Sequence, residues 1–192
     1  MLTCDDLLPS APRRVLVAGG SGSGKTTLAA RVADTLGVPH VEIDALFHGP
    51  GWTPRPQFEA DVEAFSSGPA WVTEWQYGEV RALLPRRADL LVWLDLPRST
   101  VMRQVVWRTL TRRLRRQELW NGNLEAPLWT VLTDDEHIIR WAWNTHGDWP
   151  ARIEEVAARH PGLPVVRLLS HAQAERWLRG ALATAAGGSP RG

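Results

Sequence analysis

A glycine-rich run near the N-terminus constrains the fold of this 192-residue chain more than any other feature. It reads Gly19-Gly20-Ser21-Gly22-Ser23-Gly24-Lys25-Thr26 and matches the phosphate-loop pattern G-x-x-x-x-G-K-[ST]. A β-branched apolar run at 13–18 precedes it, and apolar residues at helical spacing, Leu28, Val32 and Leu36, follow it. The chain therefore predicts a strand, a phosphate loop and a helix in that order, which is the context that such a loop requires.

The residue types in this run suit the phosphates of ATP. Glycines let successive backbone N–H groups curl around phosphate oxygens, and the helix that opens at about Gly24 adds the positive end of its dipole. We expect Lys25 to reach the β- and γ-phosphates, Thr26 to give its hydroxyl to Mg²⁺, and Thr27 to touch an α-phosphate. The expected ATP-binding residues are Gly20, Ser21, Gly22, Ser23, Gly24, Lys25, Thr26 and Thr27.

Four further short apolar runs, at 39–43, 70–74, 89–95 and 163–169, predict strands, and helical segments separate them. Five strands that alternate with helices indicate an α/β fold with a three-layer, doubly wound parallel sheet. We expect a single domain over residues 13–186. The segment 1–12 is expected to be a disordered or irregular tail, and 187–192 a disordered one.

Three acidic residues, Asp44, Glu74 and Asp95, end predicted strands. Ligands bind at the carboxyl ends of the strands in open parallel sheets, so all three side chains could face the phosphates. Asp44 suits accepting the proton of an attacking hydroxyl or holding a metal-bound water, and a helix N-cap is an equal alternative. We expect Glu74 to order Mg²⁺ through water if its strand adjoins the phosphate-loop strand, and Asp95 to cap the next helix.

The segment between residues 98 and 116 holds seven arginines and no acidic residue. At about 100° per residue, Arg108 and Arg112 share a helix face with Val101 and Val105, so the face that packs near the sheet becomes basic farther out. A guanidinium can bind two phosphoryl oxygens and neutralise charge in the transition state. The alternative is a solvated helix that pairs with acidic residues farther along the chain. The candidate catalytic arginines are Arg103, Arg108, Arg112 and Arg113.

The charge balance gives the chain no general attraction to nucleic acid or to an anionic membrane. There are 22 basic and 21 acidic residues, for a formal net charge of +1, so a nucleic-acid partner would have to meet a local patch and is not favoured. The single cysteine, Cys4, excludes a disulfide framework, and the longest apolar run, 90–94, is too short to span a bilayer. We expect a cytoplasmic protein whose partner is a small molecule.

Six segments of the chain, taken in order, resemble a known family. They are GGSGSGKTT at 19–27, VEIDALFHGPGW at 41–52, WVTEWQY at 71–77, ADLLVWLDLPR at 88–98, the arginine-rich helix, and VVRLLSHAQAERWL at 165–178. The set resembles the nucleoside-monophosphate-kinase branch of phosphate-loop proteins, in particular an adenylate-kinase-related group labelled as DNA-topology-modulation or ATP-binding proteins. The resemblance implies a sheet order of 2-3-1-4-5, an acceptor-binding region at about 44–67, and a lid carried by the arginine-rich region at about 98–147. It also implies that residues 170–172 lie near the adenine.

The chain departs from this family in two places. Relatives often have Asp-Gly-Asn-Tyr where this chain has Glu74-Trp75-Gln76-Tyr77, so Trp75 replaces a glycine and would narrow the acceptor cleft. Arg103 falls one residue early relative to the adenylate-kinase pattern, whereas Arg108 falls in place.

The residues and the resemblance together predict an enzyme, an ATP- and Mg²⁺-dependent phosphotransferase. It would move the γ-phosphoryl group to a nucleoside monophosphate or a similar small metabolite. The alternative is an ATP-hydrolysing switch that binds nucleic acid through the arginine-rich helix. The expected metal-binding residues are Thr26 and Glu74, and the expected catalytic residues are Lys25, Asp44, Glu74, Arg103, Arg108 and Arg112.

Overall fold

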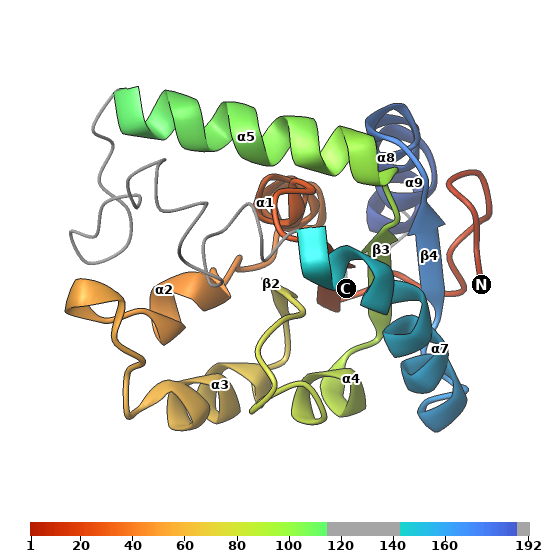
Figure 1. Cartoon of the computed structure of the whole chain (residues 1–192). Coiled ribbons are helices and arrows are strands. Elements are labelled where there is room, and N and C mark those ends of the chain that lie inside the picture. Colours follow the sequence, from red (N-terminus) through yellow and green to blue (C-terminus); the bar gives the residue numbers. More distant parts are fainter. Residues whose placement is uncertain (115–142, 188–192) are drawn as a thin grey trace.

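A parallel sheet lies between two layers of helices (Figure 1). The computed structural model describes residues 1–114 and 143–187, with side chains described as far as Thr111 in the first range. The strands are β1 (Arg14–Gly19), β2 (Trp71–Glu74), β3 (Leu90–Leu94) and β4 (Val165–Leu168), in the order β2-β1-β3-β4. The longer helices are α1 (Lys25–Leu36), α3 (Phe58–Ser66), α5 (Arg98–Leu114) and α7 (Trp149–Arg159). The shorter helical elements are α2 (Ile43–Phe47), η1 (Pro50–Trp52), α4 (Leu83–Arg87), η4 (His146–Asp148), α8 (His171–Trp177), η5 (Leu178–Leu182) and α9 (Ala183–Gly187).

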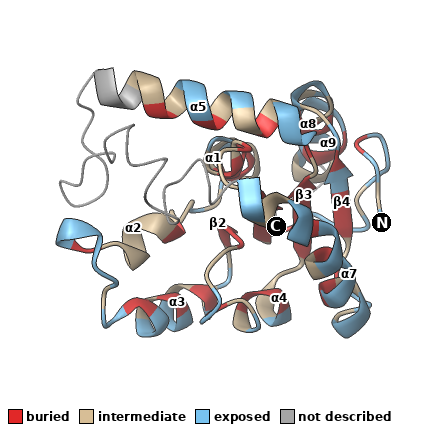
Figure 2. Cartoon of the chain, in the orientation of Figure 1, coloured by how far each residue is buried: buried red, intermediate tan, exposed pale blue. Residues whose placement is uncertain are grey.

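The strands are apolar throughout because helices cover both faces of the sheet. On β1, Val15 and Val17 pack against α1 and α5, whereas Leu16 and Ala18 point to the opposite face, where α3, α4 and α7 pack. This alternation follows from the two-residue period of a strand. Figure 2 shows the strands and the inward faces of the helices as buried. The predicted three-layer, doubly wound arrangement is therefore present in the described residues.

The predicted strand at 39–43 is not formed, so residues 1–114 and 143–187 contain four strands where five were expected. Only a parallel bridge between His40 and Val72 remains, with hydrogen bonds from Val41 N to Val72 O (2.9 Å) and from Val72 N to Pro39 O (2.8 Å). Pairing stops there because the chain turns into α2 at Ile43. The other four strands take the relative order that was expected.

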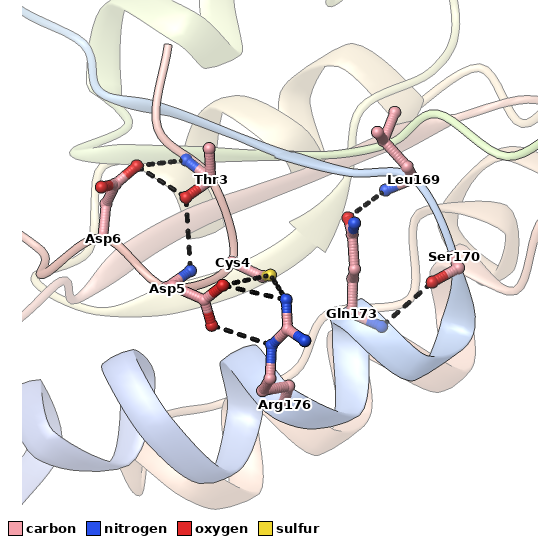
Figure 3. A network of polar contacts seen from close by, with 8 residues as sticks. All are labelled: Thr3, Cys4, Asp5, Asp6, Leu169, Ser170, Gln173 and Arg176. Atoms are coloured by element: carbon pink, nitrogen blue, oxygen red, sulfur yellow. Dashed lines mark hydrogen bonds and ion pairs between the residues drawn. The ribbon is translucent and has the colours of Figure 1, made fainter.

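The N-terminal segment 1–12, expected to be a disordered or irregular tail, packs against the far edge of the sheet. Leu2 bridges to Val166, with hydrogen bonds from Leu2 N to Val165 O (2.7 Å) and from Arg167 N to Leu2 O (2.9 Å). Cys4 is buried, and the guanidinium of Arg176 on α8 donates to its sulfur at 2.8 Å (Figure 3). The segment thus covers the open edge of β4. At the other end of the chain, α9 ends at Gly187, and residues 188–192 lie outside the described ranges.

A side-chain cap fixes the start of α8. Ser170 Oγ accepts a hydrogen bond from Gln173 N (3.1 Å), and Gln173 Oε1 accepts one from Leu169 N (2.8 Å; Figure 3). The first bond satisfies a backbone donor that the first turn of a helix leaves without a partner, and the second ties the residue before the cap back to that turn.

We expect Ser170→Ala to lower the free energy of unfolding by about 1 kcal/mol, because it removes the cap acceptor. Urea denaturation of the nucleotide-free protein measures the loss. Ser170→Asp keeps an acceptor at the same position and should restore most of the stability. Equal losses in both variants would show that the cap contributes nothing.

Candidate active site

The phosphate loop joins the end of β1 to the start of α1. Gly22 (φ 79°) and Gly24 (φ 95°) have left-handed backbone conformations, which glycine adopts without a steric penalty. A hydrogen bond from Ser23 N to Gly20 O (3.1 Å) closes the turn. The Oγ of Ser23 is buried and has no hydrogen-bond partner among the described residues. The loop therefore has the backbone form and an unsatisfied polar atom that a bound phosphate group would suit.

Lys25 folds back over this loop. Its side chain is buried, with 8% of the residue exposed, and Nζ donates to Gly20 O at 3.2 Å. Burial lowers the pKa of Lys25, while the negative charges of Asp44 and Glu74 oppose that shift. The positive charge of Arg108 lowers the pKa further. Asp44, Glu74 and Arg108, which were expected at the site from separate segments of the sequence, are thus all close enough to act on the charge of Lys25.

Asp44 lies in the first turn of α2. Its Oδ1 accepts hydrogen bonds from the amide nitrogen of Gln76 and from the hydroxyl of Tyr77, the latter at 2.5 Å. The Tyr77 hydroxyl also contacts His48 Nε2 at 3.1 Å. These three neighbours were not among the residues expected at the site, although Gln76 and Tyr77 share one of the family motifs with Glu74.

Glu74 ends β2, in register with Val17 on β1, so its strand adjoins the phosphate-loop strand as the sequence analysis required. Oε1 contacts His40 Nε2 and Oε2 accepts from Ile43 N, both at 3.1 Å. Burial opposes ionisation of Glu74, but the hydrogen bonds from His40 and Ile43 outweigh it and lower the pKa of the carboxyl group. The same contact raises the pKa of His40. Nothing in the sequence marked His40, because its partner lies 34 residues away.

Helix α5 packs directly on the phosphate loop, alongside α1 (Figure 1). A Cβ atom at Gly22 would lie 2.1 Å from Cγ2 of Val105, so only glycine leaves room for the helix. Arg108 is one turn farther along and acts on Lys25, whereas Arg103 is exposed. The side chain of Arg112, like that of Arg113, lies outside the described ones.

Two further parts of the chain border the loop. His146 Cδ2 and Trp149 Nε1 lie within 4 Å of a Cβ built at Gly20, and His171 Cε1 lies 3.5 Å from one built at Gly24. The expectation that Trp75 stands in the acceptor cleft is wrong. Its ring is buried against Trp149, with centroids 6.0 Å apart, and its Nε1 donates to Arg81 O.

Asp95 behaves as a structural residue. Its carboxylate accepts from Nε of Arg167 on β4 at 2.7 Å, and Asp95 N donates to Leu168 O. The residue therefore ties the end of β3 to β4 instead of joining the carboxylates near Lys25.

Comparison with known proteins shows which fold the chain shares. No family model matches the chain. A 44-residue segment is 48% identical to the cytidylate kinase of Nitratidesulfovibrio vulgaris (strain DP4), and it spans 23% of this chain and 19% of that enzyme. The gluconokinase from Sinorhizobium meliloti 1021 is similar in structure, with a TM-score of 0.53 at 19% identity over 93% of this chain and 95% of that chain. The shikimate kinase from Acinetobacter baumannii, in complex with shikimate, gives 0.51 at 18% identity over 91% and 89%. The chain has the fold of the P-loop kinases.

The P-loop kinase fold and the residues of the site agree on which ligands could bind. The buried Ser23 Oγ, the left-handed glycines and the inward Lys25 suit a polyphosphate, and the hydroxyl of Thr26 at the start of α1 suits Mg²⁺.

Within the described residues, no helix is both long and apolar enough to cross a membrane.

The contact between α5 and the P-loop can be tested at Gly22. Gly37, at the end of α1, also has a positive φ (63°), but nothing lies within 4 Å of its Cβ position. Gly37→Ala should therefore cost only the backbone term, about 1 kcal/mol, whereas Gly22→Ala should cost a further 1–3 kcal/mol, roughly, because Val105 must move. Urea denaturation of both variants checks this. Equal losses would place α5 away from the loop.

Proposed function

We propose that this protein is a Mg²⁺- and ATP-dependent phosphotransferase that moves the γ-phosphoryl group of ATP to a small-molecule acceptor. The phosphate loop carries the proposal: its left-handed glycines, the buried Ser23 Oγ without a partner among the described residues, and the buried Lys25 that folds back over it suit a polyphosphate. The charges of Asp44, Glu74 and Arg108 also reach Lys25. Opposite charges gathered at a phosphate loop suit a reaction in which a phosphoryl group must be neutralised and an acceptor oriented.

Each residue has a distinct proposed role. Lys25 and the backbone N–H groups of the loop hold the phosphates, and Thr26 provides an oxygen to the metal. Glu74 stands at the carboxyl end of β2, where its carboxylate can hold a water of the metal. Mg²⁺, when bound, neutralises part of the negative charge of the phosphates. Arg108 neutralises charge on the group in transfer, and Asp44 orients the acceptor.

The known proteins support a small acceptor. The cytidylate kinase, the gluconokinase and the shikimate kinase are each named for a small molecule, and two of them share this fold over most of the chain. Cytidylate, gluconate and shikimate are therefore the first acceptors to test. The leading expectation from the sequence, a nucleoside monophosphate or a similar metabolite, falls within the same range.

Replacing Lys25 by Ala should lower Mg·ATP turnover by at least about 100-fold, because the phosphates lose their buried cation. Coupled ADP release measures turnover with and without cytidine monophosphate, cytidine, gluconate, shikimate and other small hydroxyl compounds. Circular dichroism shows whether the variant is folded. Undiminished turnover in a folded variant would reject the P-loop mechanism, and hydrolysis that no acceptor accelerates would favour the ATP-hydrolysing alternative.

Arg108→Ala should reduce kcat about 100-fold and change the Kd of ATP much less, because the guanidinium would act on charge that develops during transfer. Arg179, an exposed arginine on η5, provides the matched control, and Arg179→Ala should behave as the unaltered protein. Steady-state kinetics and calorimetric titration of ATP separate the two effects. Equal losses of kcat and of ATP affinity would reduce Arg108 to a ground-state binding residue.

A further inference from the structure

Tyr77 has a backbone conformation that tyrosine rarely adopts. Its φ is 61°, in the left-handed region. The ring stacks on Phe47, with centroids 3.9 Å apart and planes at 18°, and meets the ring of Phe58 edge-on. Strained residues persist where the surroundings fix them, and they concentrate at functional sites. The strained conformation places the hydroxyl group of Tyr77 among the hydrogen bonds described next.

The hydroxyl of Tyr77 stands in a chain of hydrogen bonds with a defined direction. It donates its one proton to Asp44 Oδ1 at 2.5 Å, so the contact with His48 Nε2 at 3.1 Å requires that the imidazole nitrogen donate to the phenol oxygen. Burial and the charge of Asp44 raise the pKa of Tyr77, which keeps the phenol protonated and able to donate. The direction is therefore from His48 through Tyr77 to Asp44.

Among the described residues, both side-chain donors to Asp44 use the same oxygen atom. The amide nitrogen of Gln76 and the hydroxyl of Tyr77 reach Oδ1, from adjacent positions in the chain. Two donors on one oxygen fix the rotation of the carboxylate, and neither bond uses Oδ2. Asp44 follows Ile43, whose backbone N–H donates to Glu74 at the end of the strand beside the phosphate-loop strand, so this held carboxylate belongs to the phosphate end of the site.

We propose that Tyr77 and Gln76 position Asp44 to take the proton of a hydroxyl acceptor, and that the substrate is therefore a hydroxyl compound and not a nucleoside monophosphate accepting on its phosphate. The inference rests on the proposed phosphotransferase function. A hydroxyl nucleophile needs a group that accepts its proton, whereas a phosphate nucleophile needs none. An ionised carboxylate beside the attacking atom also repels a nucleophile that is itself a phosphate oxygen, whereas it attracts the proton of a hydroxyl, and Glu74 adds a second negative charge near Lys25.

The reaction balances with the groups named. The acceptor oxygen forms a bond to the γ-phosphorus, the bond from that phosphorus to the β,γ-bridging oxygen breaks, and its electron pair leaves with ADP. The acceptor O–H bond breaks and its proton goes to Oδ2 of Asp44, which later releases it to water. Tyr77 and Gln76 keep their protons throughout and act only on the orientation of the carboxylate.

Cytidine and cytidine monophosphate form a matched pair of probes, because they differ only in the phosphate. The unaltered enzyme is incubated with Mg·ATP and either probe, or with gluconate, shikimate or glycerol, and the products are identified by phosphorus NMR. We expect phosphate esters of one or more hydroxyl compounds and no cytidine diphosphate. Formation of cytidine diphosphate, or hydrolysis of ATP with no ester formed, would overturn the acceptor assignment. The kinase proposal would survive the first of these results and fail with the second.

A double-mutant cycle tests the positioning role. Tyr77→Phe removes the hydroxyl but keeps the ring on Phe47, and Asp44→Asn removes the proton acceptor. With the ester-forming acceptor, we expect Asp44→Asn to lower kcat about 100- to 10,000-fold and Tyr77→Phe by up to about 100-fold. The Kd of ATP, measured by calorimetry, should stay the same. In the Asp44→Asn background, Tyr77→Phe should have no further effect.

Gln76→Met provides a second variant in case Tyr77→Phe does not fold, because it removes the amide donor at similar volume. It should also lower kcat without changing ATP affinity, and lose its effect beside Asp44→Asn. Losses that multiply with Asp44→Asn, or that appear equally in ATP affinity, would overturn positioning through Asp44 and leave the kinase proposal intact. Normal turnover in Asp44→Asn would also overturn the inference, while Lys25→Ala alone decides the P-loop mechanism.

Discussion

The parallel pairing of β1 with β2 places Val17 opposite Glu74, and the site depends on this register. Because both strands run in the same direction, their carboxyl ends meet at one edge, where the phosphate loop leaves β1. A backbone bond from Trp75 N to Val17 O (2.9 Å) continues the pairing past the end of β2. The segment that follows Glu74 is thereby held beside the loop, and a shift of one residue would turn the carboxylate to the other face of the sheet.

Residues 40–44 and residues 74–77, which lie side by side at this edge of the sheet, are then joined by hydrogen bonds. Glu74 contacts His40 and the backbone of Ile43, while Gln76 and Tyr77 hold Asp44. These contacts take the place of the fifth strand. The backbone N–H of Ile43 bonds to a side chain instead of to the sheet, so the chain can turn into α2 and carry Asp44 toward Lys25. The bond from Ile43 to Glu74 therefore explains both why the strand expected at 39–43 does not form and why Asp44 lies near Lys25.

Several of these features could be read from the sequence because they are local. The glycine run, the single lysine inside it and the apolar period of the following residues predict the strand, loop and helix that the structure contains. The face shared by Val105 and Arg108 on α5 is likewise a matter of helical spacing, and the structure sets Val105 on the loop and Arg108 within reach of the charge of Lys25. The strand predicted at 39–43 was wrong because strand propensity takes no account of the Glu74 side chain, which competes with the sheet for the backbone N–H of Ile43.

The sequence by itself determined the phosphate loop, the parallel sheet and the identity of the charged groups that meet at its edge, because each follows from short periods and residue chemistry. Only the tertiary structure decided that His40 pairs with Glu74, that Trp75 is a core residue, and that Tyr77 and Gln76 hold one oxygen of Asp44. These contacts join residues about 30 or more positions apart, or depend on a strained backbone angle. No local pattern encodes such contacts, since they exist only when the strand register brings the two segments together.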